Sequence, residues 1–572
     1  MALSFKYEDD YWASRARGDW VHRSGRLSNP GGRPPRAMTP VDLLAAARVS
    51  ARAGLLRPPR PDRAWALGRA LRHWGSTLAG GFAANAARNP DRPAVVDERG
   101  ELTYGELHRR TNAQANALRE RDIGASSKVG LLCRNHAGFI EATAALAKLG
   151  ADTVSLNTGF AAPQLRDVLE RERVVAVVHD EEFTALVDGA APDMVGFVAW
   201  HDGPSDRPTL DELADAGDPG DPPRPTRPGR TIILTSGTTG TPRGAPREQR
   251  SGIAPGLALL SVLPMRFGDV SVIAAPLFHS WGFGHLALGL VLGSTAVLRR
   301  HFDPVDVLAA VGAHRAQGLV AVPVMLRRIL AVPESVRAQY DTTSLRYVAV
   351  SGSALPGRLA PDFMDAFGDV LFNLYGSTEV AYGTLAGPDD LRSAPNTAGR
   401  TLRGTTIEIR DQRDEPVPTG ERGRISVSNP MLFRGYTDGG TRPVTRGLMS
   451  TGDVGYLDEG GRLFVEGRED DMIVSGGENV FPEEVENLLL EHAGVADAAV
   501  VGVPDSEFGQ RLATYVVLAP GVSLTADDLR AYVRDHLARH KVPRDVVLVD
   551  ELPRNPTGKV VRRLLSGSGQ SG

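Results

Sequence analysis

Two periodicities of apolar residues alternate along the chain from Thr77 onward. Residues 107–119 and 138–149 carry apolar side chains at helical spacing, whereas residues 129–133 and 174–178 are short apolar runs of the kind that form buried strands. Strands that alternate with helices are typical of an open α/β sheet. The pattern therefore predicts an α/β fold for this part of the chain.

Two further apolar strands, at residues 231–234 and 347–350, run directly into loops rich in Gly, Ser and Thr. Ligand sites of open α/β sheets lie where the strands end and the loops begin. We therefore expect a binding site at these two loops. After Gly399 the pattern changes to alternating strands, at residues 406–410 and 424–427, which predicts β structure there.

The two ends of the chain differ from this middle part. Roughly the last hundred residues predict a separate small α+β unit, in which Thr525 caps a helix and Leu524 and Leu529 form a hydrophobic staple. The first 76 residues are rich in Arg and Pro and predict irregular structure with short helices. One of these helices is expected to begin at Thr39 and Pro40.

Composition narrows the class of protein. A chain of 572 residues is too long for one ordinary core, and 42% hydrophobic with 23% charged residues is usual for a globular enzyme. The single cysteine, Cys133, excludes an intrachain disulfide and a cluster of thiolate metal ligands. The N-terminal residues lack the apolar stretch of a signal peptide. We therefore expect a cytoplasmic protein.

One segment has the length and composition of a membrane span. Residues 270–298 contain no Lys, Arg, Asp or Glu and are long enough to cross a bilayer. The segment is interrupted, however, by Pro276, His279, Gly282 and Gly284. These residues favour a buried strand, a loop and a Gly-rich helix.

Charge is distributed unevenly along the chain. The net charge of −4 gives no reason to expect a nucleic-acid partner. Residues 1–76, however, carry fourteen Lys and Arg against six Asp and Glu, a net charge of +8, which leaves −12 for the rest. This arm is either packed on the main domain or a basic element at a membrane surface. Because the candidate motifs all follow it, we expect it to affect location or stability, not chemistry.

The strongest local motif follows the strand at residues 231–234. It consists of Thr235, Ser236, Gly237, Thr238, Thr239 and Gly240, with Arg243 close behind. Glycines let backbone N–H groups approach phosphate oxygens, hydroxyls add donors, and one cation offsets the charge. The motif is not the phosphate loop of ordinary NTPases. Taken alone, it is also compatible with a flexible turn.

Five further segments follow in order: residues 373–379 (NLYGSTE), 450–453 (STGD), 467–473 (GREDDMI), 475–482 (SGGENVFP) and 552–559 (LPRNPTGK). In this order and spacing they resemble the adenylate-forming superfamily of acyl-CoA synthetases, luciferases and adenylation domains. Within it, the chain is most similar to the bacterial fatty acyl-CoA synthetases. The resemblance runs from about Thr77 to Leu565.

The resemblance implies a fold and a domain organisation. After the extension at residues 1–76, we expect a large N-terminal domain at residues 77–468, with two α/β sheets and a β-barrel. Residues 469–572 are expected to form a small mobile α+β lid, with a hinge near Asp470.

The resemblance also implies roles in ATP binding. Residues Thr235 to Gly240 match the loop that holds the β- and γ-phosphates, and Arg243 stands where the family usually has lysine. Tyr375 matches the ring that stacks on adenine, and Thr378 the donor to the α-phosphate. Glu379 matches the Mg²⁺ ligand. Other expected contacts of the nucleotide are Gly352, Ser353, Ala354, Asn373, Gly376, Ser377, Asp453 and Arg468, with Asp453 at the ribose and Arg468 at the ribose or a phosphate.

Residues expected at the acid and thiol follow from the same resemblance. His279 matches a residue beside the reacting carboxylate, and Phe278, Trp281 and Phe283 are interpreted as the wall of the acyl pocket. All four are also compatible with an ordinary core. Lys559 matches the lysine that bridges the carboxylate and the α-phosphate. The predicted path of coenzyme A is formed by Ser475, Gly476 and Gly477.

The implied reaction has two steps and uses ATP, Mg²⁺ and coenzyme A. A carboxylate attacks ATP to give acyl-AMP and pyrophosphate, and the thiol of coenzyme A then releases AMP. A medium- or long-chain fatty acid is the expected substrate. The alternatives are a bulky aryl or polycyclic acid, transfer to a separate carrier protein, or a non-catalytic binder. Contact with a membrane surface through the basic arm and a homodimer are both compatible with the sequence.

Overall fold

The computed structural model describes residues 40–235, 242–247, 254–475, 478–505, 508–556 and 558–565. By its internal contacts the chain divides into two units, Met1–Ala47 and Arg48–Gly572. The site lies in the second unit. The boundaries predicted at residues 76 and 468 stay predictions.

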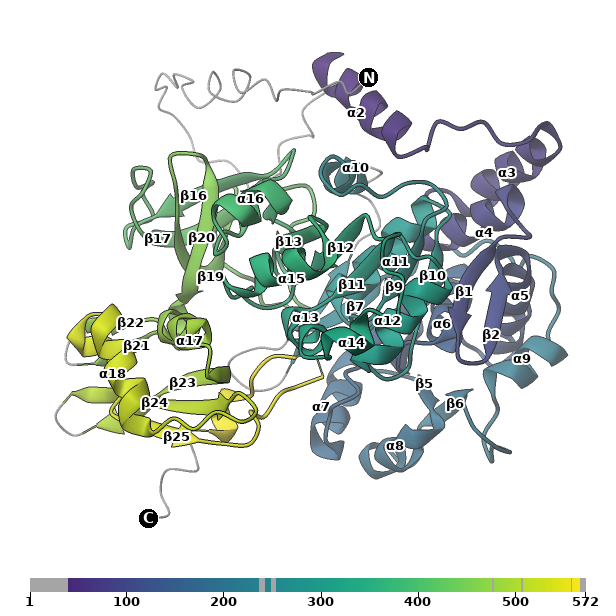
Figure 1. The fold of residues 1–572 in the computed structure, drawn as a ribbon. Helices are drawn as coiled ribbons and strands as arrows, with labels where there is room; N and C mark the ends of the chain where they lie inside the picture. The colour runs from purple at the N-terminus through teal and green to yellow at the C-terminus, as the bar shows by residue number, and fades with distance from the viewer. Residues whose placement is uncertain are drawn as a thin grey trace, which may run out of the picture. The chain divides into compact units, whose positions relative to one another are not determined.

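One sheet of the second unit has the strand order β6-β5-β3-β4-β7-β8 (Figure 1). Its strands are parallel except for β8, which pairs antiparallel with β7. The bounds are β3 (Lys128–Leu132), β4 (Asp152–Ser155), β5 (Ala176–Asp180), β6 (Val195–Trp200), β7 (Thr231–Thr235) and β8 (Arg243–Arg247).

The largest sheet has the order β16-β17-β19-β20-β15-β14-β13-β12-β11-β9-β10-β1-β2, with β18 beside β19. From β13 to β1 the neighbours are parallel, and beyond β13 they are antiparallel. The bounds are β1 (Pro93–Asp97), β2 (Gly100–Thr103), β9 (Val270–Ile273), β10 (Thr295–Val297), β11 (Gly318–Ala321), β12 (Tyr347–Val350), β13 (Leu371–Tyr375), β14 (Thr384–Ala386), β15 (Gly399–Thr401), β16 (Thr406–Arg410), β17 (Gly423–Ser428), β18 (Val444–Thr445), β19 (Leu448–Leu457) and β20 (Arg462–Arg468).

The C-terminal residues form a smaller sheet of their own, in the order β22-β21-β24-β23 with β25 beside β24. Its strands are β21 (Ile473–Ser475), β22 (Glu478–Val480), β23 (Val495–Asp505), β24 (Gly509–Leu518) and β25 (Asp545–Leu548). Two helices pack on it, α17 (Pro482–Glu491) and α18 (Ala526–His536). The observed architecture therefore confirms the predicted fold class, a large mixed α/β part followed by a smaller α+β part.

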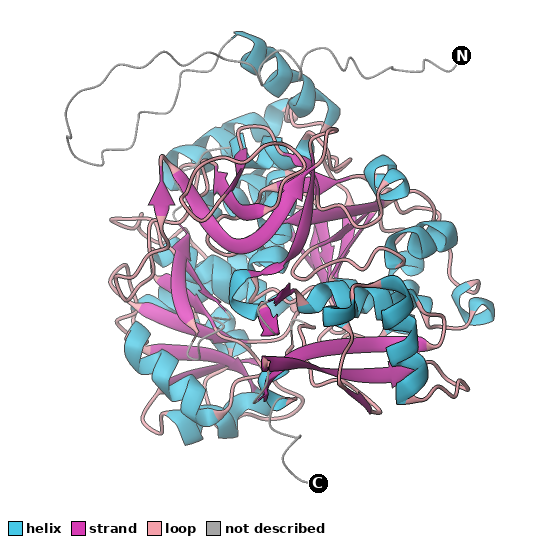
Figure 2. Ribbon diagram, turned by 90° about the vertical axis from the view of Figure 1, so that its left-hand side faces the viewer, coloured by secondary structure: helices cyan, strands magenta, loops and turns pink. Residues whose placement is uncertain are grey.

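Helices flank the strands of the two larger sheets (Figure 2). The helices that precede the C-terminal part are α2 (Pro40–Arg52), α3 (Pro61–Trp74), α4 (Leu78–Arg88), α5 (Tyr104–Arg119), α6 (Ala137–Leu149), α7 (Ala162–Glu172), α8 (Thr184–Ala190), α9 (Leu210–Ala216), α10 (Ala254–Leu260), α11 (Ser280–Val291), α12 (Pro304–Ala313), α13 (Pro323–Leu330), α14 (Glu334–Arg337), α15 (Leu359–Phe367) and α16 (Pro388–Ser393).

The elements that the sequence predicted from local signals coincide with elements of the structure. The predicted strands at residues 347–350 and 406–410 coincide with β12 and β16. Thr525 caps α18 by accepting a hydrogen bond from the backbone N–H of Asp528, as the sequence predicts. The uncharged segment at residues 270–298 folds as β9, α11 and β10. In the part of the chain that the structure describes, no helix is long and apolar enough to cross a membrane.

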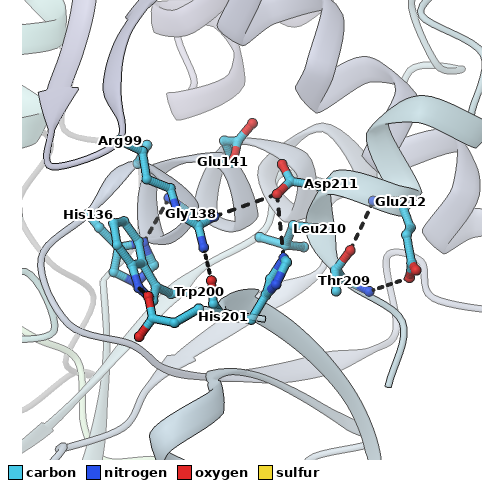
Figure 3. Close-up of polar contacts among 12 residues, drawn as sticks. Arg99, His136, Gly138, Glu141, Trp200, His201, Thr209, Leu210, Asp211 and Glu212 are labelled. Atoms are coloured by element: carbon cyan, nitrogen blue, oxygen red, sulfur yellow. Dashed lines mark hydrogen bonds and ion pairs between the residues drawn. The ribbon is translucent and has the colours of Figure 1, made fainter. Parts of the chain in front are cut away.

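A polar network joins α9 to its neighbours (Figure 3), and none of its residues that the figure labels lines the cavity described below. The carboxylate of Asp211 forms ion pairs with Arg99 at 3.6 Å and His201 at 3.7 Å, and also with Arg110. Arg110 in turn pairs with Glu141, whose pKa is raised by burial. We interpret this network as structural, because its charges pair with one another.

Candidate active site

A cavity of about 1480 Å³ lies at the ends of β12 and β13. It gathers residues that the sequence places in separate motifs. The predicted site residues that line it are Thr235, Arg243, His279, Trp281, Phe283, Gly352, Ser353, Ala354, Asn373, Tyr375, Gly376, Ser377, Thr378, Glu379, Asp453, Arg468, Asp470 and Lys559. Their assigned roles stay predictions, but their common location is observed.

Some predicted residues are not placed at this cavity. Ser236, Gly237, Thr238, Thr239, Gly240, Gly476 and Gly477 lie outside the described residues. Among those described, Ser475 and Phe278 do not line the cavity. Phe278 is 5% exposed and packs in the main core, whereas the next residue, His279, lines the cavity. The interpretation of Phe278 as acyl-pocket wall is therefore wrong for this structure.

One end of the cavity has the features of a nucleoside site. Tyr375, the last residue of β13, donates a hydrogen bond from its hydroxyl to Asp453 Oδ2 at 2.6 Å. Asp453 stands opposite Arg468 in the β19–β20 register, and their charged groups are 3.9 Å apart. Gly352 adopts φ +98°, which allows the loop after β12 to turn without strain. A flat ring beside a carboxylate suits a base followed by a ribose.

Burial raises the pKa values of both Asp453 and Tyr375. Desolvation raises the pKa of Asp453, and the Tyr375 hydroxyl and the Arg468 charge only partly offset it. The pKa of Tyr375 is raised well above its usual value, first by burial and then by the neighbouring Asp453 carboxylate. Tyr375 therefore remains a neutral donor, which fixes the direction of the hydrogen bond.

The turn after β13 presents Glu379 to the cavity. A Cβ at Gly376 would lie 2.3 Å from the carbonyl oxygen of Ala381, so the tight turn requires glycine. Ser377 donates from its hydroxyl to Glu379 Oε2 at 2.9 Å. Burial alone would raise the pKa of Glu379, but hydrogen bonds from Tyr436 and Ser377 and the charge of Arg442 lower it below its usual value. Glu379 is therefore an ionised carboxylate at the cavity wall.

Sequence reasoning missed Tyr436 and Arg442, which complete the surroundings of Glu379. The Tyr436 hydroxyl donates to Glu379 Oε1 at 2.7 Å, and Arg442 Nε lies 3.4 Å from the same oxygen. Both side chains line the cavity. They come from a loop without a motif of its own, and a cation in such a loop gives no sequence signal.

Arg243 is held in place by groups that the sequence did not associate with it. Its guanidinium donates two hydrogen bonds to Asp438, both at 2.7 Å, and lies 4.0 Å from the centre of the Tyr436 ring. A phosphate would have to compete with this carboxylate for Arg243. Arg442, which is paired with Glu379, also lines the cavity.

His279 and Trp281 lie where the cavity turns from polar to apolar. His279 occupies the N-cap position of α11, and burial together with the charge of Lys559 lowers its pKa to about 4. The imidazole is therefore neutral near pH 7. Trp281 donates from its indole nitrogen to the carbonyl oxygen of Ala321 at 3.0 Å, which fixes the ring.

Lys559 comes from the C-terminal part and enters the cavity on a tight turn. Its backbone N–H donates to Asn555 Oδ1, and its carbonyl accepts from the Asn555 N–H, both at 2.9 Å. Although the residue is exposed to the cavity, the surrounding walls desolvate the ammonium group and lower its pKa, assisted by the charge of Arg468. The negative charges of Asp453 and Glu379 oppose this effect.

Comparison with known proteins agrees with this geometry. Residues 82–437 match the AMP-binding enzyme family, and residues 484–559 match the AMP-binding enzyme C-terminal domain. The chain belongs to the AMP-binding enzyme family, whose members form acyl-adenylates. Its class is that of AMP-forming acid–thiol ligases, which use ATP, Mg²⁺ and coenzyme A.

Three relatives illustrate the range of this class. The chain is 34% identical to a feruloyl-CoA synthase of an Amycolatopsis species, over 83% of this chain and 96% of the other. It is 32% identical to the 3-[(3aS,4S,7aS)-7a-methyl-1,5-dioxo-octahydro-1H-inden-4-yl]propanoyl:CoA ligase of Rhodococcus jostii, over 82% and 95%. The structure is similar to o-succinylbenzoate CoA synthetase of Bacillus subtilis with its acyl-adenylate, at 28% identity, TM-score 0.75 and coverage of 85% and 97%.

Proposed function

We propose that this chain joins a large hydrophobic carboxylic acid, with an aryl or polycyclic body, to coenzyme A. A carboxylate oxygen attacks the α-phosphorus of ATP, which gives acyl-AMP and releases pyrophosphate. The thiol of coenzyme A then attacks the acyl carbonyl, and AMP leaves. The observation that carries the proposal is a single cavity lined by Tyr375, Asp453, Glu379, His279 and Lys559 together.

Lys559 is proposed to act at the adenylation step. A cation fixed at the reacting centre stabilises the charge that develops as the oxygen attacks phosphorus. His279, neutral near pH 7, is proposed to lie beside the carboxylate without adding a second positive charge there. Catalysis then depends on positioning and charge neutralisation, and no nucleophilic side chain is required.

The surroundings of Glu379 fit a magnesium ion bound together with a triphosphate. The residue offers an ionised carboxylate at the cavity wall, and Mg²⁺ prefers one or two carboxylates completed by phosphate oxygens and water. When bound, Mg²⁺ would neutralise charge on the phosphates. Arg442, now beside Glu379 Oε1, is proposed to turn to the triphosphate.

Two observations bear on the acid. The relatives named above take an aryl and a polycyclic acid, which favours such a body over the fatty acid expected from the sequence. A fatty acid is the second candidate, because the cavity continues past His279 between apolar helix faces. Either acid would need an apolar pocket with few polar groups.

The test is ATP–pyrophosphate exchange by the full-length protein with fatty, aryl and polycyclic acids, followed by thioester formation with coenzyme A. We expect exchange with at least one hydrophobic acid and consumption of its adenylate by free coenzyme A. Exchange without thioester formation would favour transfer to a separate carrier protein. No exchange with any acid would support the non-catalytic alternative and overturn the proposal.

A further inference from the structure

The cavity continues well beyond the reacting centre, along the face of α11 that begins at His279. Ser280, Gly284, Ala287 and Val291 recur every three or four residues on this face, and all line the cavity. A helix rises about 1.5 Å per residue, so Ser280–Val291 spans about 18 Å. This length is much greater than a single aromatic ring needs.

The helix α4, which contacts α11, adds a face of small residues to the wall of the cavity. Gly81 and Ala84 line the cavity, with Arg88 further along the same face. A Cβ added at Gly81 would meet only Leu290 Cβ at 3.9 Å, and one added at Gly284 would have nothing within 4 Å. We call this part of the cavity, which is lined by α4 and α11 and also by Leu257 and Leu260 of α10, the channel.

The far end of this channel involves α3, which precedes residue 82, where the family match begins. Ala70 and Trp74 anchor α3 by packing against Ala79 and Ala83 of α4. Leu67 and Leu71, four residues apart on the neighbouring edge of α3, line the cavity. The sequence predicted no role in chemistry for residues 1–76, and it gave no sign that two leucines of this segment line the cavity.

The apolar side chain of Leu71 is only partly buried in the folded chain. Its exposed fraction is 46%, although its neighbour on the helix, Trp74, is only 4% exposed. An apolar ligand in the channel would cover this surface and gain free energy by doing so.

We propose that α3 closes the far end of the channel, and that Leu67 and Leu71 limit the length of the apolar body that the enzyme accepts. This inference rests on the proposed function, since it takes the occupant to be the acyl group of the substrate. It deepens that function by naming the substrate class: a carboxylic acid with an extended apolar body that reaches past His279 along α11.

The experiment uses full-length Gly284→Leu and Leu71→Trp, with Gly68→Leu as the matched control. Gly68 lies on α3 and is not among the described residues that line the cavity. A Cβ added at Gly68 would have nothing within 4 Å, so the control substitution creates no clash at that atom. Thioester formation and pyrophosphate exchange are measured with a homologous series of straight-chain and ω-phenyl acids of increasing length.

Gly284→Leu should lower kcat/KM for long acids at least tenfold and leave short acids and the KM for ATP unchanged. Leu71→Trp should shift the preferred length towards shorter acids, by about fourfold in kcat/KM for each methylene excluded. Leu71→Ala should favour longer acids. If Gly284→Leu does not fold, Gly284→Ala replaces it in the experiment. Gly284→Ala should also lower kcat/KM for long acids, but by less.

The outcomes separate this inference from the proposed function. If the native enzyme makes thioesters and neither Gly284→Leu nor Leu71→Trp changes its length profile, the channel is not the acyl site and the inference falls. If both variants change how pyrophosphate exchange depends on acid length but no thioester forms, the channel is supported as the acyl site. Coenzyme A is then not the acceptor. A Gly68→Leu effect equal to that of Leu71→Trp would reduce the role of α3 to stability.

Discussion

The two parts of the molecule that meet at the cavity contribute to it in different ways. The large part supplies groups tied to its own strands, such as Tyr375 bonded to Asp453 and Ser377 bonded to Glu379. The C-terminal part supplies Lys559 from the end of a turn. The nucleotide site is therefore built into one sheet, whereas the reacting cation is brought in by a separately folded unit.

Polar side chains and a close turn join these two parts. Asp497 of β23 accepts hydrogen bonds from Arg327 of α13 at 2.6 Å and from Arg554 of its own part. The Gly558 turn packs close to Val324, where a Cβ would lie 2.5 Å from Val324 Cγ1. A few polar contacts and one close turn hold Lys559 at the cavity, while Ser475 lies elsewhere. This difference between the large part and the C-terminal part favours a lid that docks in more than one orientation, with Asp470 as the proposed hinge.

Removing the lid's cation should have the largest effect. Lys559→Ala is expected to slow acyl-AMP formation by about 10²–10³-fold, because charge at the reacting centre loses its fixed partner. Thioester formation from supplied acyl-AMP should remain largely intact. Pyrophosphate exchange and thioester assays measure the two steps separately. Lys541→Ala, a lid lysine paired with Glu484, is the control, and equal loss in both half-reactions would contradict a step-specific role.

Removing the Glu379 carboxylate, which belongs to the large part, should have the next largest effect. Glu379→Gln is expected to raise the Mg²⁺ concentration needed for half-maximal adenylation by about 10–100-fold, as for other changes around metal sites. A magnesium titration of pyrophosphate exchange measures this. Glu415→Gln, at an exposed ion pair with Arg446, should leave the titration unchanged. An unaltered titration of Glu379→Gln would argue against a magnesium ligand at this position.

Weakening the contact between the parts should have a smaller effect. Arg327→Ala is expected to slow adenylation about three- to tenfold, since one partly buried charged hydrogen bond contributes about 1 kcal/mol or somewhat more. Thioester formation from acyl-AMP should be unchanged or faster. Arg328→Ala is the matched control, because Arg328 stacks on Phe302 and belongs to the same helix. Similar rates for the two variants would mean that the Asp497 contact does not position the lid.

The last prediction concerns the pH dependence of stability at His279 and not a reaction rate. Its pKa is about 4 in the folded protein and about 6.5 in an unfolded chain, so the unfolded state takes up the proton first as the pH falls. Its contribution to stability is present above about pH 6.5 and is lost progressively towards pH 4. Urea unfolding of the native protein and of His279→Gln gives the free energy of unfolding of each protein between pH 4 and about 6.5. If the two free energies change in parallel with pH, His279 is not a buried neutral imidazole.

Local sequence determined the elements and the nucleotide motifs. Strand and helix periods placed β12, β16 and α18, because apolar spacing and capping are short-range signals. The loops after β7 and β12 were predicted to carry a ligand site because such sites lie where the strands of an open α/β sheet end. Gly376 and Glu379 follow the end of β13, and both were identified from the single motif at residues 373–379.

Only the tertiary structure decided which groups meet. Arg243 pairs with Asp438, 195 positions further along the chain, and that partner belongs to no motif. The orientation of Phe278 into the core and of His279 into the cavity depends on how α11 packs, which the apolar run around them does not specify. Leu67 and Leu71 reach the channel because α3 packs on α4. Such contacts depend on long-range packing, so spacing along the chain does not determine them.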